Sequence, residues 1–171
     1  MVRSDLRSLR RNEQAFTLVE LLIVVIILAI LAAIVVPQFV ASADDAKLAA
    51  LDSNLRNFRS AVALYNQQHG EYPGALGDGV NAANTEAAFV TQLTTFTTDA
   101  GVSSATKTAT AIYGPYITRS TMPPDPIHNV ATVEVIGTGS LPLVASGTNG
   151  GWKFDSATGQ FVMNDTGYDD R

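Results

Sequence analysis

The sequence predicts an α+β fold, in which a long N-terminal α-helix packs on a small antiparallel β-sheet domain. An apolar segment near the N-terminus continues into a stripe of apolar residues at helical spacing. Only after Ile112 does the chain change to short β-prone segments separated by turn residues. A helical half followed by a strand-rich half is typical of an α+β domain and not of an alternating α/β one.

The apolar segment is long enough to cross a membrane. From Phe16 to Val36 only Thr17 and Glu20 interrupt it, and a helix of this length reaches about 30 Å, the thickness of a bilayer's hydrocarbon core. An excess of arginine ahead of the segment keeps that flank in the cytoplasm. These residues are Arg3, Arg7, Arg10 and Arg11. We therefore expect a single-pass protein whose C-terminal domain lies outside the cytoplasm.

The helix is predicted to run from about Phe16 to about Gln68. Apolar residues recur in steps of three and four beyond the membrane segment, on one helical face. They are Leu48, Leu51, Leu55, Phe58, Val62 and Tyr65. Gly70 is a natural helix stop. Pro37 removes one backbone hydrogen bond and is predicted to kink the helix without ending it.

A short second helix is predicted after a loop rich in Gly, Asn and Pro. Asn84 is expected to cap this helix, which would present an apolar face. That face consists of Phe89, Leu93 and Phe96. The next stretch, residues 97–110, is polar and is predicted to be an exposed loop.

Three or four antiparallel strands are predicted in the last third of the chain. Residues 132–136 read as one strand, and residues 151–154 with 160–163 read as a hairpin. The aromatic residues of the hairpin are expected to face the core; they are Trp152, Phe154 and Phe161. The final segment, 164–171, either frays or folds back as a loop.

Composition argues against several functional classes. Of the 11 Lys and Arg and the 16 Asp and Glu residues, four Arg and two acids lie in residues 1–15, so seven basic and fourteen acidic residues remain. Such an acidic domain is not expected to bind nucleic acid. No cysteine is available for a disulfide. His69 and His128 are predicted in loops, and no catalytic motif is found, so the sequence does not predict an enzyme.

Glu20 is the unusual residue of the apolar segment. An unpaired ionisable side chain near the centre of a membrane helix costs about 2.5 kcal/mol or more. Something must therefore compensate the carboxylate of Glu20, unless the side chain lies close enough to the interface to stay hydrated.

The run Ala15-Phe16-Thr17-Leu18-Val19-Glu20-Leu21-Leu22-Ile23-Val24, after an Arg-containing leader, resembles the prepilin signature of type IV pilins and pseudopilins. The resemblance implies a pilin-like fold. It also implies that a prepilin peptidase cleaves between Ala15 and Phe16, that the new amine of Phe16 is methylated, and that Glu20 pairs with an N-terminal amine during filament assembly. The usual residue before the cut is glycine, and Ala15 stands here instead.

Three later stretches resemble the major pseudopilin of type II secretion systems: residues 65–73, Gly114-Pro115-Tyr116-Ile117 and Met122-Pro123-Pro124-Asp125-Pro126. The resemblance implies a leader in residues 1–15, a membrane and filament-core segment in 16–42, and a periplasmic domain in 43–171. It also implies location in the bacterial inner membrane, self-polymerisation, and minor pseudopilins and an inner-membrane assembly platform as partners. The chain departs from that family at 127–129, where Ile-His-Asn follows Asp-Pro.

Proteins of that family often bind a structural calcium ion near the C-terminal sheet, through oxygen ligands. Candidate donors here are Asp125, Asp155 and Asp165, but no spacing singles them out and no metal ligand is assigned. Turn positions for Asp125 and Asp155, and a surface position for Asp165, are the simpler interpretation.

Three alternatives remain open at this point. A type IV pilin for adhesion or motility would share the same signature. A secretory signal peptide is suggested by Ala41-Ser42-Ala43, although the apolar run is longer than that of usual signal peptides. A signal-anchored periplasmic enzyme or binding protein would give no reason for Phe16 and Glu20 to stand in this order.

Overall fold

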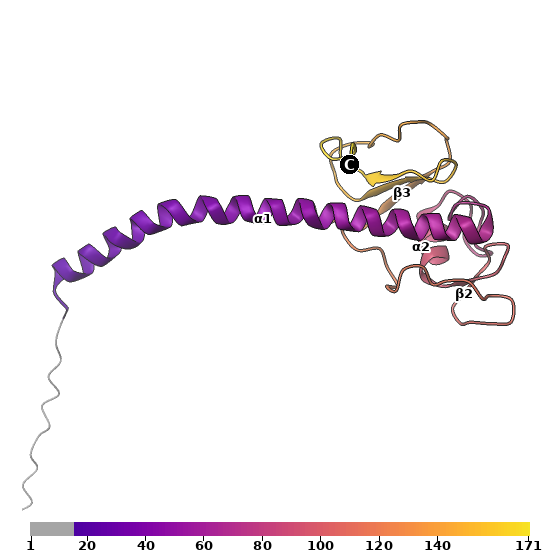
Figure 1. Ribbon diagram of the computed structural model, residues 1–171, viewed down its shortest axis with the longest axis horizontal. Helices are drawn as coiled ribbons and strands as arrows, with labels where there is room; N and C mark the ends of the chain where they lie inside the picture. Colours follow the sequence, from indigo (N-terminus) through magenta and orange to yellow (C-terminus); the bar gives the residue numbers. More distant parts are fainter. Residues whose placement is uncertain (1–15) are drawn as a thin grey trace, which may run out of the picture. The chain divides into compact units, whose positions relative to one another are not determined.

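The computed structural model describes residues 16–171, so the predicted leader and Ala15 lie outside the described residues. The structure divides into two units, one ending at Ala43 and the other comprising Asp44–Arg171. The elements in chain order are α1 (Leu18–His69), α2 (Glu86–Thr94), β1 (Phe96–Thr97), β2 (Ser103–Ser104), β3 (Val133–Ile136), β4 (Trp152–Asp155) and β5 (Phe161–Met163) (Figure 1). The predicted α+β class is confirmed.

In the first unit, α1 is almost entirely apolar. All of its residues up to Ala43 are exposed, because no other part of this unit covers them. The helix continues through Pro37, as predicted. The kink expected at Pro37 stays a prediction.

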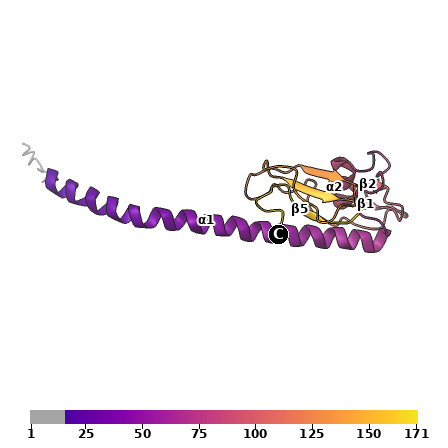
Figure 2. The same ribbon diagram turned by 90° about the horizontal axis from the view of Figure 1, so that it is seen from above.

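In the second unit, the C-terminal part of α1 lies beside the strands and buries one face against them (Figure 2). The buried residues are Leu51, Leu55, Phe58, Ala61, Val62 and Tyr65, which confirms the predicted stripe except for the half-buried Leu48. The helix ends at His69. Gly70 then adopts a left-handed φ of 75° and its N–H donates to the carbonyl of Asn66 (2.8 Å), a common helix stop.

The short helix α2 begins one residue later than predicted. Thr85 and not Asn84 is its N-cap, and the Thr85 Oγ1 atom accepts a hydrogen bond from the Ala88 N–H (3.2 Å). Asn84 instead takes a left-handed φ of 57° just before the cap. Phe89 and Leu93 are buried on the inner face of α2, as predicted. The predicted place of Phe96 on this face is wrong, because the helix ends at Thr94 and Phe96 lies in β1.

The main sheet has the order β3-β4-β5. The hairpin of β4 and β5 is antiparallel, as predicted, with Phe154 opposite Phe161. The prediction of an all-antiparallel sheet is wrong for β3 and β4, which are parallel. Residues 137–151 form a connection long enough to return the chain to the starting end of β3, which parallel pairing requires.

The prediction of an exposed loop over residues 97–110 is partly wrong. β1 and β2 form a two-stranded antiparallel ribbon, and Thr97 is fully buried, with its N–H donating to the Tyr113 carbonyl (3.0 Å). Strands of two residues show no periodicity, so local pattern could not find them.

The core lies where α1 meets the hairpin. The ring of Phe58 packs edge-on against Trp152, with the two ring centroids 5.3 Å apart. The centroid of the Phe58 ring also lies 5.0 Å from that of Phe161. Trp152, Phe154 and Phe161 are buried, so their predicted core position is confirmed.

The C-terminal segment folds back onto α1. Arg171 forms an ion pair with Asp52 (3.0 Å), and the Arg59 guanidinium donates to the Arg171 carbonyl and to the Phe161 carbonyl (3.0 Å). Of the two alternatives left open for this segment, the structure shows the folded one.

Gly159 offers a test of how closely the turn between β4 and β5 packs against Tyr72. It has a φ of 74°, and a Cβ added there would overlap the ring of Tyr72. We expect Gly159→Ala to lower the free energy of unfolding by about 1–3 kcal/mol, through backbone strain and steric overlap. Chemical denaturation followed by Trp152 fluorescence would measure it. Gly147→Ala is the matched control, because a Cβ there meets nothing within 4 Å; equal effects of the two changes would contradict the prediction.

Candidate functional site

Residues 18–24 of the prepilin-like signature form the first turns of α1, and Thr17 caps the start of this helix. The Glu20 Oε2 atom accepts hydrogen bonds from the backbone N–H and from the Oγ1 hydroxyl of Thr17, both at 2.9 Å. The Thr17 Oγ1 atom in turn accepts from the Glu20 N–H at 3.2 Å. This reciprocal pair is a capping box, which satisfies donors that the start of a helix leaves free.

Sequence reasoning missed the role of Thr17. The signal was present, because Thr-x-x-Glu ahead of an apolar run is the sequence pattern of a capping box. The carboxylate of Glu20 therefore has a local partner, in addition to the amine that the resemblance implies. Phe16 directly precedes this cap and is exposed. Pairing of Glu20 with an N-terminal amine stays a prediction.

The helix that follows is apolar enough to enter a membrane. Within residues 16–171, α1 is the one helix whose length and composition would allow it to cross a bilayer. Its N-terminal part exposes a long series of large apolar side chains, from Leu18 to Val40, and Phe16 ahead of the helix is exposed as well. A continuous apolar surface of this size requires lipid or other apolar helices around it.

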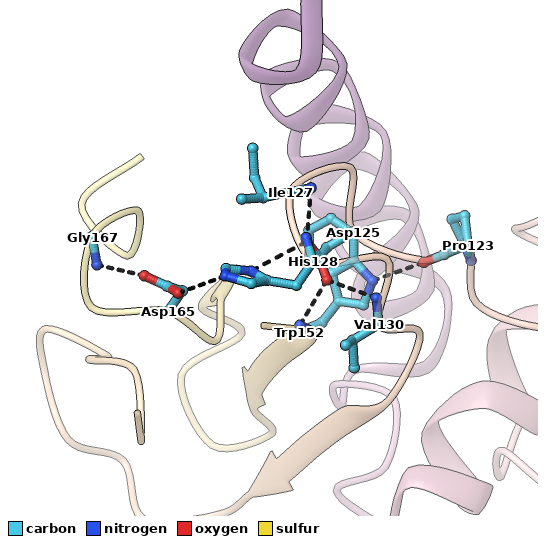
Figure 3. A network of polar contacts seen from close by, with 9 residues as sticks. Pro123, Asp125, Ile127, His128, Val130, Trp152, Asp165 and Gly167 are labelled. Carbon is cyan, nitrogen blue, oxygen red and sulfur yellow. Dashed lines mark hydrogen bonds and ion pairs between the residues drawn. The ribbon is translucent and has the colours of Figure 1, made fainter. Parts of the chain in front are cut away.

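The three aspartates considered as calcium donors lie in the second unit, and Asp125 is the most constrained. Its side chain is fully buried and accepts four backbone N–H groups (Figure 3). Oδ1 accepts from Ile127 (2.9 Å) and His128 (2.6 Å), and Oδ2 accepts from Val130 (2.9 Å) and Gly151 (3.0 Å). Asp125 thus ties the turn that follows it to the start of β4.

His128 connects Asp125 to Asp165. Its Nδ1 lies 3.7 Å from the Asp125 Oδ1, and its Nε2 lies 3.5 Å from the Asp165 Oδ2 (Figure 3). The Asp165 Oδ1 accepts the Gly167 N–H at 2.7 Å. Asp165 is buried, so the prediction of a surface position for it is wrong.

Asp155 lies apart, at the end of β4, in a turn as predicted. Its Oδ1 accepts the Ala157 N–H, and its Oδ2 accepts the Gly139 N–H, both at 2.9 Å. A calcium site needs carboxylate and carbonyl oxygens that converge on one point, whereas the oxygens of these three aspartates already face N–H groups or the imidazole. The residues do not fit a calcium ion. Across 16–171, no group of three or more acidic, His or Cys side chains is arranged to hold a metal.

The electrostatics of Asp125 follow from the same contacts. Burial alone would raise the pKa of this carboxyl. Hydrogen bonds from the backbone N–H groups of His128, Gly151, Val130 and Ile127 outweigh it and hold the pKa of Asp125 below its ordinary value. The group is therefore ionised at neutral pH and acts as an anionic acceptor inside the fold.

Comparison with known proteins agrees with the signature at the start of α1. The pattern of the prokaryotic N-terminal methylation motif matches residues 10–36. Two proteins named type II secretion system core protein G are similar. The one from Pseudomonas aeruginosa is 39% identical over 64 residues, covering 37% of this chain and 45% of the relative. The one from Klebsiella michiganensis is 33% identical over 64 residues, which again cover 37% of this chain and 45% of the relative.

A third relative belongs to a different system. The type IV narrow pilus major component PilA5 of Thermus thermophilus is 46% identical over 55 residues, covering 32% of this chain and 47% of the relative. The chain thus spans less than half the length of the curated relatives it matches. No solved structure matches the chain.

Proposed function

We propose that this chain, a pilin-like protein that carries the N-terminal methylation motif, is a structural subunit of a type IV pilus-like filament. More specifically, we assign it as the major pseudopilin of a type II secretion system. The observation that supports the proposal is the motif across residues 10–36, with Phe16 and Glu20 at the start of a long apolar helix. Its role is structural and not catalytic, in keeping with the pilin-like family.

Processing would precede assembly. In the precursor, residues 1–15 lie in the cytoplasm and residues 16–42 lie in the inner membrane, with 43–171 in the periplasm. A prepilin peptidase cleaves between Ala15 and Phe16 and methylates the new amine of Phe16. The small side chain of Ala15 suits a tight cleavage site as glycine does.

The mature protein is therefore expected to start at Phe16 with a methylated amine. Intact-mass analysis of protein purified from the native host would measure both the start and the added methyl group. A start at Asp44, after Ala41-Ser42-Ala43, would instead establish a cleaved signal peptide and overturn the proposal.

Assembly follows from the exposed apolar half of α1. Once withdrawn from lipid, this surface must be covered, and the same segments of many copies would cover one another in a filament core. The second units would then form the filament surface. An inner-membrane platform would supply the subunits, and minor pseudopilins would be further partners.

A type IV pilin is the second candidate, favoured by the similarity to the narrow-pilus component of Thermus thermophilus. A deletion strain separates the two functions. For a pseudopilin we expect loss of protein secretion with surface pili unchanged. Loss of surface pili or of twitching motility, with secretion intact, would establish the pilin function instead. Restoration of the lost property by the wild-type gene is the control.

A further inference from the structure

Asn149-Gly150 is the one Asn-Gly pair of the sequence, and it lies in the long connection between β3 and β4. Asn149 is exposed. Within residues 16–171, neither its side-chain amide nor the backbone N–H of Gly150 forms a hydrogen bond. By contrast, the side chains of Asn84 and Asn164 are hydrogen-bonded. The amide of Asn149 is therefore able to rotate over the peptide nitrogen that follows it.

Glycine is required at position 150 by the packing of a histidine. Gly150 has a φ of 80°, in the left-handed region that favours glycine. A Cβ added there would lie 2.6 Å from the Cβ of His128, the residue that connects Asp125 to Asp165. The same absence of a side chain removes the atoms that would keep the amide of Asn149 away from the Gly150 nitrogen.

We propose that Asn149 is a site of spontaneous deamidation. The backbone nitrogen of Gly150 attacks the Cγ atom of Asn149, and the Cγ–Nδ2 bond breaks. Nδ2 leaves as ammonia with the proton from the Gly150 nitrogen, and a cyclic imide remains. Solvent water then opens the imide at either of its two carbonyl carbons. One opening leaves aspartate in a normal main chain, and the other leaves isoaspartate, whose main chain is one carbon longer. Both products carry one new negative charge.

The isoaspartate product lengthens a segment that is anchored on both sides. Before it, the Gly147 carbonyl accepts the Thr166 N–H at 3.0 Å. After it, the Gly151 N–H donates to the Asp125 Oδ2 at 3.0 Å. Only residues 148–150 lie between these contacts, so an added carbon must displace one of them. We expect the contact with Asp125 to weaken, because Gly151 directly follows the altered pair, and the second unit to lose stability.

Peptide mass spectrometry tests the modification. The full chain is aged in dodecylphosphocholine micelles in warm, mildly alkaline buffer. We expect the peptide that contains Asn149 to gain about 1 Da, and an isoaspartate-specific methyltransferase to label part of the product. The internal reference is Asn57, which is also exposed but lies within α1 and precedes Phe58; it should keep its mass.

The variant Asn149→Gln should lose this gain, because its longer side chain would have to close a larger and less favourable ring. The proposal is overturned if residue 149 of the wild type gains no mass. It is also overturned if Asn57 gains mass as fast, or if the glutamine variant is modified like the wild type.

Denaturant unfolding of the same samples, followed by Trp152 fluorescence, tests the consequence. Aged wild type should unfold at a lower denaturant concentration than fresh protein, whereas aged Asn149→Gln should unfold as its fresh form does. Asn149→Asp is the matched control, because it carries the new charge on a normal main chain at an exposed position. It should unfold as fresh wild type does. Equal stability of aged and fresh wild type would overturn the proposed loss of the contact with Asp125, and so would an Asn149→Asp variant as unstable as aged protein.

Discussion

Glu20→Val and Glu20→Gln subunits are both expected to be inserted and cleaved before Phe16, but to form no filaments. Valine removes the cost of placing a carboxylate in hydrocarbon, so insertion should be unimpaired or easier. The proposed pairing with a methylated Phe16 amine needs a negative charge, and such a pair is strong where water is scarce. Filaments would be counted by electron microscopy and in sheared fractions.

The glutamine variant separates the two roles of this side chain. Gln at the third helical position still completes a capping box with Thr17, so it keeps the contact seen in the structure while losing the charge. Filaments of Glu20→Gln as abundant as wild type would show that the role of Glu20 is to cap α1. Asp45→Asn, which removes a carboxylate from the exposed surface of α1 in the second unit, is the control and should assemble normally.

Asp125→Asn is expected to lower the free energy of unfolding by about 3 kcal/mol. The carboxylate accepts four backbone N–H groups in a buried site. An amide would present its own N–H₂ to two of them and leave buried donors unpaired. Denaturation of the full chain in micelles, followed by Trp152 fluorescence, would measure the loss. Asp170→Asn, at an exposed position, should change stability little.

Lowering the pH should also remove the contribution of Asp125 to the free energy of unfolding. The folded-state pKa of Asp125 lies below its ordinary value of 3.8, so its stabilising effect is complete above that value and is lost as the pH falls through the folded pKa. The pKa values of Asp78 and Glu134 are also lowered, so these groups lose their stabilising effect in acid in the same way. The difference in stability between wild type and Asp125→Asn should therefore narrow below pH 3.8. A difference that stays constant with pH would contradict the assigned ionisation.

Local pattern predicted the parts of the fold that depend on nearby residues. The α1 stripe, the Gly70 stop and the β4–β5 hairpin are each specified within a few residues, by helical spacing or turn chemistry. The parallel pairing of β3 with β4 depends on where a long connection returns, which no local pattern encodes. The buried position of Asp165 likewise depends on His128, far away in sequence.

The residues of the candidate site were likewise predicted where a local pattern identifies them. Phe16 and Glu20 stand out because their order in an apolar run is unusual, and the methylation motif matches there. The partner of Glu20 in the structure is Thr17. The capping-box pattern Thr-x-x-Glu could have predicted this contact.

The packing of α1 on the final hairpin has a consequence for the order of folding. Phe58 contacts Trp152 and Phe161, and Arg59 donates to the Phe161 carbonyl across 102 positions of the chain. Contacts between residues so distant in sequence form late and slow the folding of a domain. During synthesis of the chain, the apolar face of α1 therefore emerges first and stays uncovered until the last strands arrive. A chain truncated before β4 would keep that face uncovered, which makes it prone to aggregation and to proteolysis.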